Sequence, residues 1–212
     1  MITVAVCYLL APEGNIMNLF ASLIGVSALI FVAKGYVIGQ ILLVVFSIFY
    51  GIISFGFKYY GEMITYLGMS APIAILSVVS WLRHPYGKTD EVEVSRVSRK
   101  SVIAVSILTV IVTVAFYFIL EALGTENLFF STVSVTTSFA AASLTFLRSP
   151  YYALGYACND IVLIVLWVLA TVEDISYLPM IVCFAVFFVN DMYGFINWQR
   201  MKRRQNKAYY AQ

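Results

Sequence analysis

Seven runs of mostly apolar residues, each about 20 residues long, dominate the sequence and constrain its fold. Of the 212 residues, 62% are hydrophobic and only 11% are charged, which is too few to cover a soluble domain of this length. The runs are continuous rather than alternating, so they favour membrane helices over a membrane barrel. We therefore predict an all-α polytopic membrane protein.

The apolar runs predict seven transmembrane helices, with the charged segment 83–100 between the third and the fourth. Residues 1–14 are too short to span and lack a basic start, so we interpret them as an interfacial lead-in rather than a signal peptide. Pro72 predicts a kink or loosened hydrogen bonding, with a hinge and a static bend both open. The predicted spans are 15–33, 36–56, 60–82, 101–122, 127–147, 151–171 and 177–198.

Basic residues fix the expected orientation. In the seven-span arrangement, 12 of the 13 Lys and Arg residues fall on one side, and only Lys58 falls on the other. Basic residues near span ends are retained in the cytoplasm, so we expect the N-terminus outside and the C-terminus inside. The basic tail can also contact anionic membrane lipid. The residues on the basic side are Lys34, Arg83, Lys88, Arg96, Arg99, Lys100, Arg148, Arg200, Lys202, Arg203, Arg204 and Lys207.

Two short similarities indicate an internal duplication. Segment 18–22 (NLFAS) is similar to segment 127–131 (NLFFS), and Trp81-Leu82-Arg83 is similar to Trp198-Gln199-Arg200. Three spans, a linker span and three more spans give parallel 3+1+3 repeats, an arrangement that places a transport site between repeats. The expected organisation is a lead-in at 1–14, a first repeat at 15–83, a cytoplasmic loop at 84–100, a linker helix at 101–126, a second repeat at 127–199 and a basic tail at 200–212.

Two Asn-Asp pairs, Asn159-Asp160 and Asn190-Asp191, lie inside the sixth and seventh spans. Such residues are costly in hydrocarbon and usually face a protein interior or a solute pathway. Asp160 is nine residues and Asp191 seven residues from the inner end of its span, so both lie at similar depth. We expect the pairs to meet on adjacent helices, where one of two close carboxyls would hold a proton. A substrate site, a proton relay and helix-to-helix contact all remain open.

The seventh span carries the strongest candidate binding face. Asn190, Tyr193, Gly194 and Asn197 recur at i, i+3, i+4 and i+7, so they share one side of a helix. Amides that donate and accept, a ring with a hydroxyl, and space at glycine suit an uncharged polar heterocycle or a sugar. Asp191 and Trp198 lie on the neighbouring face.

Further polar residues lie along other spans. In the sixth span, Asp160 and Trp167 line up on one face. In the second, Gln40 heads a stripe of small and hydroxyl residues, and its amide needs hydrogen-bond partners. Similar stripes run along the first span (Asn18, Ser22, Gly25) and the fifth (Ser131, Ser134, Ser138, Thr145), where close helix packing explains them as well as a pathway does.

The sequence argues against several classes of function. The three cysteines form no CxxC or Cys/His cluster, and the single His84 lies in a basic loop, so we expect no metal site and no cofactor. No nucleophile–base pair is evident, so an enzyme is not expected. The basic residues follow the topology and do not indicate nucleic-acid binding.

Three segments of the chain are distinctive: Ala33-Lys34-Gly35, segment 59–62 (YYGE), and the run from Asn190 to Trp198. They resemble the corresponding segments of the PnuC family of nicotinamide riboside transporters. Segment 81–94 is similar to members from low-GC Gram-positive bacteria, which implies a bacterial cell membrane. The resemblance implies a fold like the SWEET sugar transporters, and substrate contacts from Asn190, Tyr193, Asn197 and Trp198. A homo-oligomer, such as a trimer, is also expected.

The family resemblance implies facilitated diffusion of nicotinamide riboside, followed by phosphorylation in the cytoplasm that traps the substrate. Segment 76–81 (LSVVSW) lacks most of the aromatic cluster that the family carries there. This departure leaves thiamine, riboflavin and deoxynucleosides open as substrates. A proton-coupled transporter and a substrate-binding subunit of an ATP-driven complex are the remaining alternatives.

Overall fold

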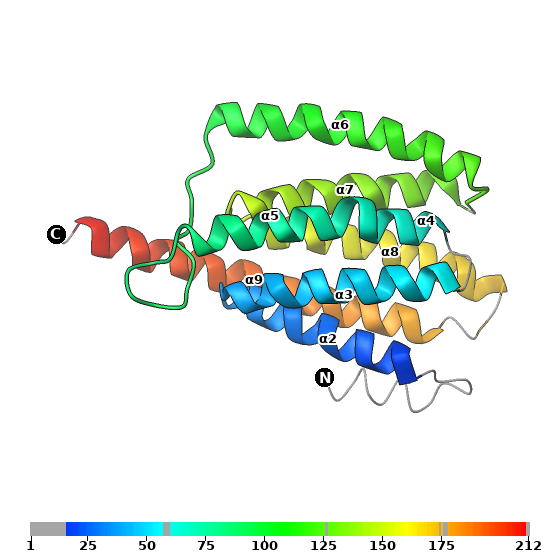
Figure 1. Cartoon of the computed structure of the whole chain (residues 1–212), viewed down its shortest axis with the longest axis horizontal. Helices are drawn as coiled ribbons and strands as arrows, with labels where there is room; N and C mark the ends of the chain where they lie inside the picture. Colours follow the sequence, from blue (N-terminus) through cyan, green and yellow to red (C-terminus); the bar gives the residue numbers. More distant parts are fainter. Residues whose placement is uncertain (1–15, 57–59, 126, 174, 176–177, 211–212) are drawn as a thin grey trace.

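The computed structural model of the chain describes residues 16–56, 60–125, 127–173, 175 and 178–210. This part is helical, apart from turns and two isolated β-bridges (Figure 1). Three elements, α4, η1 and α5, follow one another without a break and form one rod. The elements are α2 (Ile16–Ala33), α3 (Val37–Gly56), α4 (Tyr60–Ile64), the π-helix η1 (Thr65–Ser70), α5 (Ala71–Leu82), α6 (Arg99–Ala122), α7 (Leu128–Phe146), α8 (Tyr152–Glu173) and α9 (Leu178–Tyr210).

Five of these rods are long and apolar enough to cross a membrane. They are the η1–α5 rod, α6, α7, α8 and α9, while α2 and α3 supply shorter described apolar stretches. Large apolar side chains remain exposed on the outer surface, as at Ile103, Ile107 and Phe118 of α6, which suits lipid contact. A multi-pass membrane protein is thus confirmed, and five of the seven predicted spans are described as helices long enough to cross a membrane.

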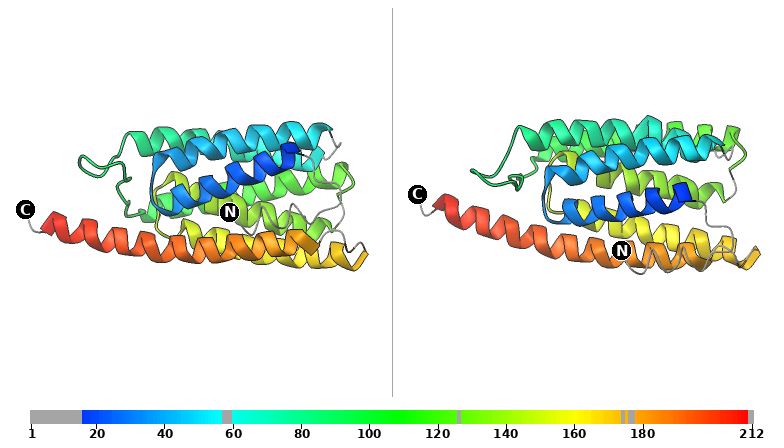
Figure 2. Two further views of the ribbon diagram at one scale, coloured as in Figure 1. Left: turned by 90° about the horizontal axis from the view of Figure 1, so that it is seen from below. Right: turned by 60° about the horizontal axis from the view of Figure 1, so that its bottom comes forward.

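Six helices form a closed ring in which each contacts the next along the chain. The contacts run from α2 to α3, α5, α7, α8 and α9, and α9 packs back against α2. Helix α6 lies outside the ring and packs on α7, where the Thr113 and Thr136 hydroxyls are 2.9 Å apart (Figure 1). The helices run side by side along the long axis, and α9 extends beyond the others toward the C-terminus (Figure 2).

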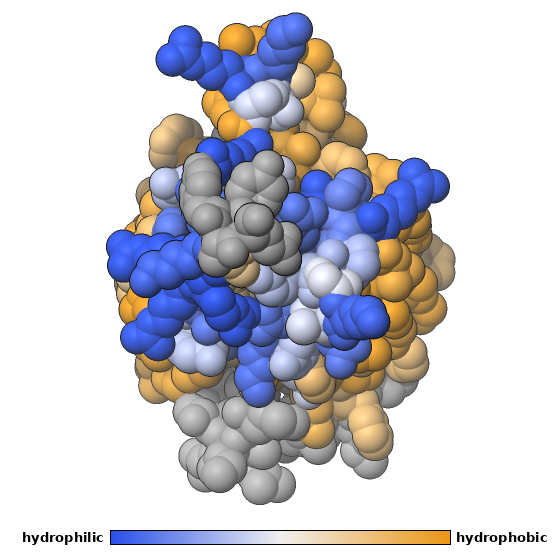
Figure 3. Space-filling model, turned by 90° about the vertical axis from the view of Figure 1, so that its left-hand side faces the viewer, coloured by the Kyte–Doolittle hydropathy of each residue, from blue (hydrophilic) through white to orange (hydrophobic). Residues whose placement is uncertain are grey.

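Polar residues gather at the end of the ring where α2, α5 and α7 finish. Figure 3 shows this end as a hydrophilic surface bordered by apolar flanks. The end carries the basic residues that the sequence analysis placed on one side, and we call it the basic face. The lead-in at 1–14, Lys58 and the side chains of Asn18 and Ser22 lie outside the described residues.

Pro72 lies near the start of α5, directly after the π-helix Thr65–Ser70. Proline has no backbone N–H and its ring crowds the preceding turn, so the regular hydrogen bonding cannot run through it. The wider π-helical turns immediately before Pro72 are the loosened hydrogen bonding that the sequence predicts, since such segments relieve a local mismatch inside a helix.

Helices α2 and α7 end in the same Schellman motif, spaced 113 residues apart. In α2, the Tyr36 amide donates to Phe31 and the Gly35 amide to Val32; in α7, Ser149 donates to Leu144 and Arg148 to Thr145. The left-handed position is occupied by Gly35 (φ 77°) in one turn and by Arg148 (φ 55°) in the other. A Cβ on Gly35 would come within 2.5 Å of the terminal methyl of Met201, a flexible side chain that can shift, so the positive φ is the main reason for glycine there.

The loop between α5 and α6 joins these two turns. The Val92 amide donates to the Gly35 carbonyl at 2.9 Å, and the Ser95 amide to the Arg148 carbonyl at 3.0 Å. Burial lowers the pKa of the Arg148 guanidinium from its ordinary value, and Glu93, 3.9 Å away, offsets part of that shift. The loop, which the sequence analysis placed at 84–100, is therefore fastened to both halves of the ring.

Helix α9 also holds this loop, because it continues beyond the predicted end of the seventh span at residue 198. Gln205, largely buried, accepts from the Val94 amide (2.8 Å) and donates to the Val92 carbonyl (3.1 Å). Arg204 pairs with Glu91. The basic tail is thus, through Tyr210, the last turns of α9, kept helical by its packing on the loop.

Candidate functional site

Two buried tryptophans close the basic face from opposite sides of the ring. Trp81 ends α5 and Trp198 lies in α9; both are fully buried, and their ring centroids are 5.4 Å apart. Tyr152, at the start of α8, packs edge-on against Trp198 with a centroid distance of 4.9 Å. Together they form the centre of an apolar cluster with Val32, Val92, Ala153 and Met201.

The tryptophans and their preceding residues exchange hydrogen bonds between the two halves. Trp81 donates from Nε1 to the Thr145 carbonyl at 3.0 Å, and Ser80 donates to the Phe146 carbonyl at 2.9 Å. In the other half, Trp198 donates to the Val32 carbonyl at 3.0 Å and Asn197 to the Ala33 carbonyl at 2.9 Å. Each half thus holds the end of the other half's first helix, and we call these four bonds the reciprocal caps.

The carboxyl groups of Asp160 and Asp191 meet between α8 and α9. Both residues are buried, at 4% and 5% exposure, and their side chains lie within hydrogen-bonding reach of each other. The predicted meeting of the two helices at equal depth is therefore observed for the aspartates. A hydrogen bond between two carboxyl groups requires a proton on one of them.

Two tyrosines on α8 extend this carboxyl pair toward the tryptophans. Tyr152, Tyr156 and Asp160 are spaced four residues apart, so they share one face of α8. Both tyrosines interact electrostatically with Asp191, and their rings are 6.3 Å apart. The sequence analysis missed both, although their spacing from Asp160 is the signal that would have found them. We call Tyr152, Tyr156, Asp160 and Asp191 the carboxyl–tyrosine cluster.

Three of the expected site residues carry a buried polar atom without a hydrogen-bond partner. They are Gln40 at Nε2, Asp160 at Oδ2 and Asn190 at Nδ2. Gln40 is 1% exposed and lies one turn into α3. Because unpaired buried polar atoms cost free energy, a site with free donors and acceptors is suited to a polar ligand.

Other expected site residues hold helices together. Asn159 accepts at Oδ1 from Ser134 (3.0 Å) and Thr137 (2.8 Å), which fastens α8 to α7. Asn197 and Trp198 are engaged in the reciprocal caps. These contacts support the helix-packing interpretation of the serine stripe on α7 and of the first Asn in the Asn-Asp pairs.

The candidate face of α9 is turned relative to the expected one. Its buried stripe is Asp191, Gly194, Trp198, Met201 and Gln205, at alternating steps of three and four residues. Tyr193 lies to the side of this stripe and is 49% exposed, whereas Gly194 packs against Tyr152 and Ala33. The structure therefore does not bring Tyr193 together with the carboxyl–tyrosine cluster. Trp167 lies half-buried farther along α8.

No group of three or more His, Cys, Asp and Glu side chains positioned to hold a metal ion occurs among the described residues. Charge in the ring is supplied instead by the two aspartates. The arrangement can attract a cation, stack on aromatic rings and hydrogen-bond to amide or hydroxyl groups.

Comparison with known proteins identifies relatives across nearly the whole chain. Residues 15–200 match the model of the nicotinamide mononucleotide transporter family. The nicotinamide riboside transporter PnuC of Neisseria mucosa is 26% identical over 208 residues, which cover 95% of this chain and 78% of the relative. The crystal structure of the vitamin B3 transporter PnuC superimposes with a TM-score of 0.77 at 25% identity, covering 95% of this chain and 88% of that one. All are transporters, in agreement with the expectation that the chain is not an enzyme.

Trp81→Phe and Trp198→Phe should destabilise the protein to a similar extent. Each removes the indole N–H and so one of the two hydrogen bonds that a helix-end carbonyl accepts, the other coming from the Schellman turn, at a cost of roughly 0.5–1.5 kcal/mol. Thermal unfolding in detergent measures both, with Tyr117→Phe on the exposed surface of α6 as the matched control. A loss of thermal stability in only one of the two variants would show that the two tryptophan hydrogen bonds are not equivalent.

Proposed function

Because the chain belongs to the nicotinamide mononucleotide transporter family, we propose that it carries nicotinamide riboside across the membrane down its gradient. A cytoplasmic kinase would trap the substrate by phosphorylation. The observation that carries this proposal is the buried carboxyl–tyrosine cluster inside a ring of membrane helices. Nicotinamide riboside combines a pyridinium cation, a carboxamide and ribose hydroxyls, and the cluster offers a partner for each.

The charge of the site favours the riboside over the mononucleotide. The seven predicted spans contain no Lys or Arg, and two aspartates lie where the substrate would bind. A mononucleotide phosphate would face these carboxyls without a basic partner, whereas the pyridinium is attracted by them. Tyr152 and Tyr156 supply ring faces for stacking, and we propose Trp167 as a further aromatic contact.

The free amide donors complete the proposed binding site. Gln40 Nε2 can donate to the carboxamide oxygen or the ribose hydroxyls, and the Asn190 amide, which lies beside the Asp191 carboxyl, can donate to either the substrate or Asp191. Asn159, Asn197 and Trp198 are assigned to holding helices, and Tyr193 to the outer side of α9. The proposed substrate contacts are therefore Gln40, Tyr152, Tyr156, Asp160, Trp167, Asn190 and Asp191.

The reciprocal caps support a gate at the basic face. They join α5 to α7 and α9 to α2, which are the two contacts between the halves of the ring. The matching Schellman motifs and caps support the 3+1+3 parallel repeats, with α6 as the linker, and a SWEET-like rocking of one repeat against the other. We propose that breaking these caps opens the substrate path to the cytoplasm.

The basic face is proposed to be cytoplasmic, because Lys and Arg near span ends are retained there. This places the described end of α9 inside the cell and the N-terminus outside. Assembly as a trimer remains a proposal, and the exposed apolar surface of α6 is available for it. The membrane would be the bacterial cell membrane.

Proton coupling is the second candidate, because the Asp160–Asp191 pair can exchange the proton that it shares. A proton-coupled carrier would accumulate substrate against its gradient when a pH gradient is imposed. A subunit of an ATP-driven complex would not transport on its own. Other vitamins and nucleosides remain alternative substrates.

Asp160→Asn combined with Asp191→Asn should weaken binding of nicotinamide riboside by roughly tenfold, since it removes the single negative charge of a pair that shares one proton, and a nearby charge at reduced dielectric contributes about 1.4 kcal/mol or more. Either single substitution leaves one carboxylate in place and should keep most of the affinity. Binding of the reduced riboside, whose dihydropyridine ring is uncharged, should change far less. Calorimetric titration of purified protein with both ligands measures this, and Glu121→Gln on α6 is the charge-matched control. An equal loss of affinity for both ligands would contradict charge attraction. Tight binding of thiamine, riboflavin or a deoxynucleoside, with no binding of the riboside, would overturn the proposed substrate.

Purified protein in liposomes should equilibrate labelled nicotinamide riboside without accumulating it. Internal substrate is expected to level off at the external concentration, with or without an inward pH gradient, because a uniporter adds no driving force. Accumulation that collapses when the pH gradient is removed would establish proton coupling instead. Binding without uptake would favour the ATP-driven alternative.

A further inference from the structure

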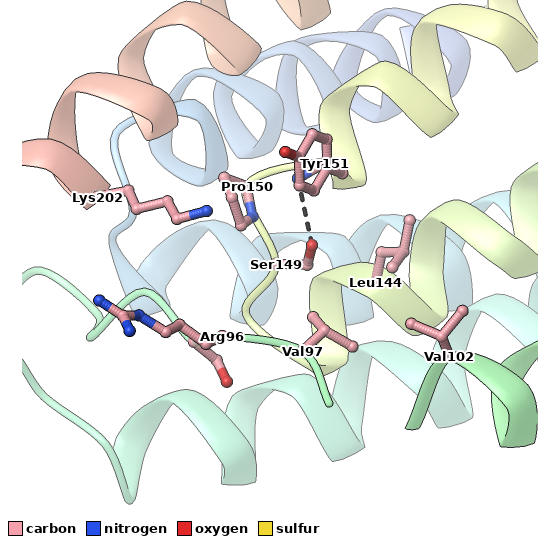
Figure 4. Close-up of a pocket in the computed structure, with 9 residues that line it drawn as sticks. Arg96, Val97, Val102, Leu144, Ser149, Pro150, Tyr151 and Lys202 are labelled. Carbon is pink, nitrogen blue, oxygen red and sulfur yellow. Dashed lines mark hydrogen bonds between the residues drawn. The ribbon is translucent and has the colours of Figure 1, made fainter. Parts of the chain in front are cut away.

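A cavity of about 270 Å³ opens at the basic face, outside the ring. It lies where the loop enters α6, beside the turn between α7 and α8 and the extension of α9 (Figure 4). Much of its lining is apolar, from Val97, Val102, Leu144, Pro150 and Tyr151. Tyr151 faces this cavity, while the adjacent Tyr152 packs on Trp198 in the ring, so the cavity is separate from the proposed substrate site.

Two cations line the cavity, Arg96 on the loop and Lys202 on α9. Arg96 donates from Nη2 to Asn206 Oδ1 at 3.3 Å, and Asn206 lies one turn after Lys202 on α9. This bond holds the Arg96 guanidinium on the side of α9 that carries Lys202. The Lys202 ammonium lies 5.7 Å from the centre of the Tyr151 ring, and Figure 4 shows the side chain extending toward Pro150.

Neither cation pairs with a carboxylate within the ranges that the structure describes. The ion pairs at this face use Arg148 with Glu93 and Arg204 with Glu91. Arg96 and Lys202 thus leave a net positive charge beside an apolar wall. An anion bound there would neutralise this charge.

We propose that the cavity binds one anionic phospholipid, with its phosphate between Arg96 and Lys202 and its upper acyl region on the apolar lining. The cavity is lined by the start of α6, the end of α7, the turn before α8 and the part of α9 beyond the predicted seventh span, which places it at the level of lipid headgroups. Basic pockets between membrane helices bind such headgroups, and each Lys or Arg near the surface contributes about a factor of five in affinity. A free phosphate would use the cations but leave the apolar lining bare.

The bound lipid would add to the contacts by which α9 already holds the loop. Arg96 lies on the loop next to Ser95, whose amide holds the Arg148 turn, and Lys202 lies on α9, one turn beyond Trp198. A phosphate that bridges Arg96 and Lys202 would therefore strengthen the attachment of the loop to α9 and stabilise the closed basic face.

Native mass spectrometry and lipid titration of the delipidated full chain test the proposal with dioleoyl phosphatidylglycerol, dioleoyl phosphatidylcholine and inorganic phosphate. The wild type should bind one phosphatidylglycerol in preference to phosphatidylcholine. Millimolar inorganic phosphate should not displace it. Arg96→Gln combined with Lys202→Gln should weaken phosphatidylglycerol binding roughly 25-fold. The matched control, Arg83→Gln with Lys88→Gln, removes two exposed cations of the same face that do not line the cavity, and it should bind like the wild type.

Three results would overturn the proposal. They are equal binding of both lipids by the wild type, displacement by inorganic phosphate alone, and unchanged phosphatidylglycerol binding in the Arg96/Lys202 variant. If the double variant fails to fold, Lys202→Met, which keeps the apolar stem, replaces it and should weaken binding about fivefold. The two wild-type measurements, the comparison of the two lipids and the displacement by phosphate, test the proposal even if no variant folds.

Discussion

The exchange of tryptophan hydrogen bonds between the two halves is the interaction on which the basic face depends. A helix that ends inside a membrane protein leaves carbonyl groups that water cannot reach, so donors must come from the protein. Trp81 and Trp198 each supply one to the other half's first helix, and their rings pack on each other. The same bonds therefore complete two helix ends and join the halves, which is why the loop, the turns and α9 all assemble around them.

In the proposed function, this arrangement connects substrate binding with closure of the path. Asp191 lies two turns before Trp198 on α9, and Tyr152 both packs on Trp198 and interacts with Asp191. A cation attracted to the aspartates would contact the residues that hold the gate. A ligand can shift a conformational equilibrium only if it binds one state better than the other. The proximity of the aspartates to Tyr152 and Trp198 offers a way for a ligand to do so.

Spacing along the sequence predicted the helices, the basic face and the depth of the two aspartates, because these follow from hydropathy and the rise of a helix. It did not predict which side of α9 faces the ring: a helical repeat fixes the angles between Asn190, Tyr193 and Asn197, but tertiary packing decides which angle is buried. Trp81 and Trp198 were visible as matching repeat ends. Their bonds to Thr145 and Val32 were not, since these cross more than 60 residues of chain.

The central claim is that the reciprocal caps form the gate, and the distance between the ends of α5 and α9 at the basic face tests it most directly. Spin labels at Leu82→Cys and Arg200→Cys, with Cys7, Cys158 and Cys183 replaced by Ser, report that distance in liposomes by pulsed electron paramagnetic resonance. We predict a short and a long population, a change in their ratio with nicotinamide riboside, and a shift to the long one in Trp198→Phe. A single distance that neither substrate nor the substitution alters would contradict the account.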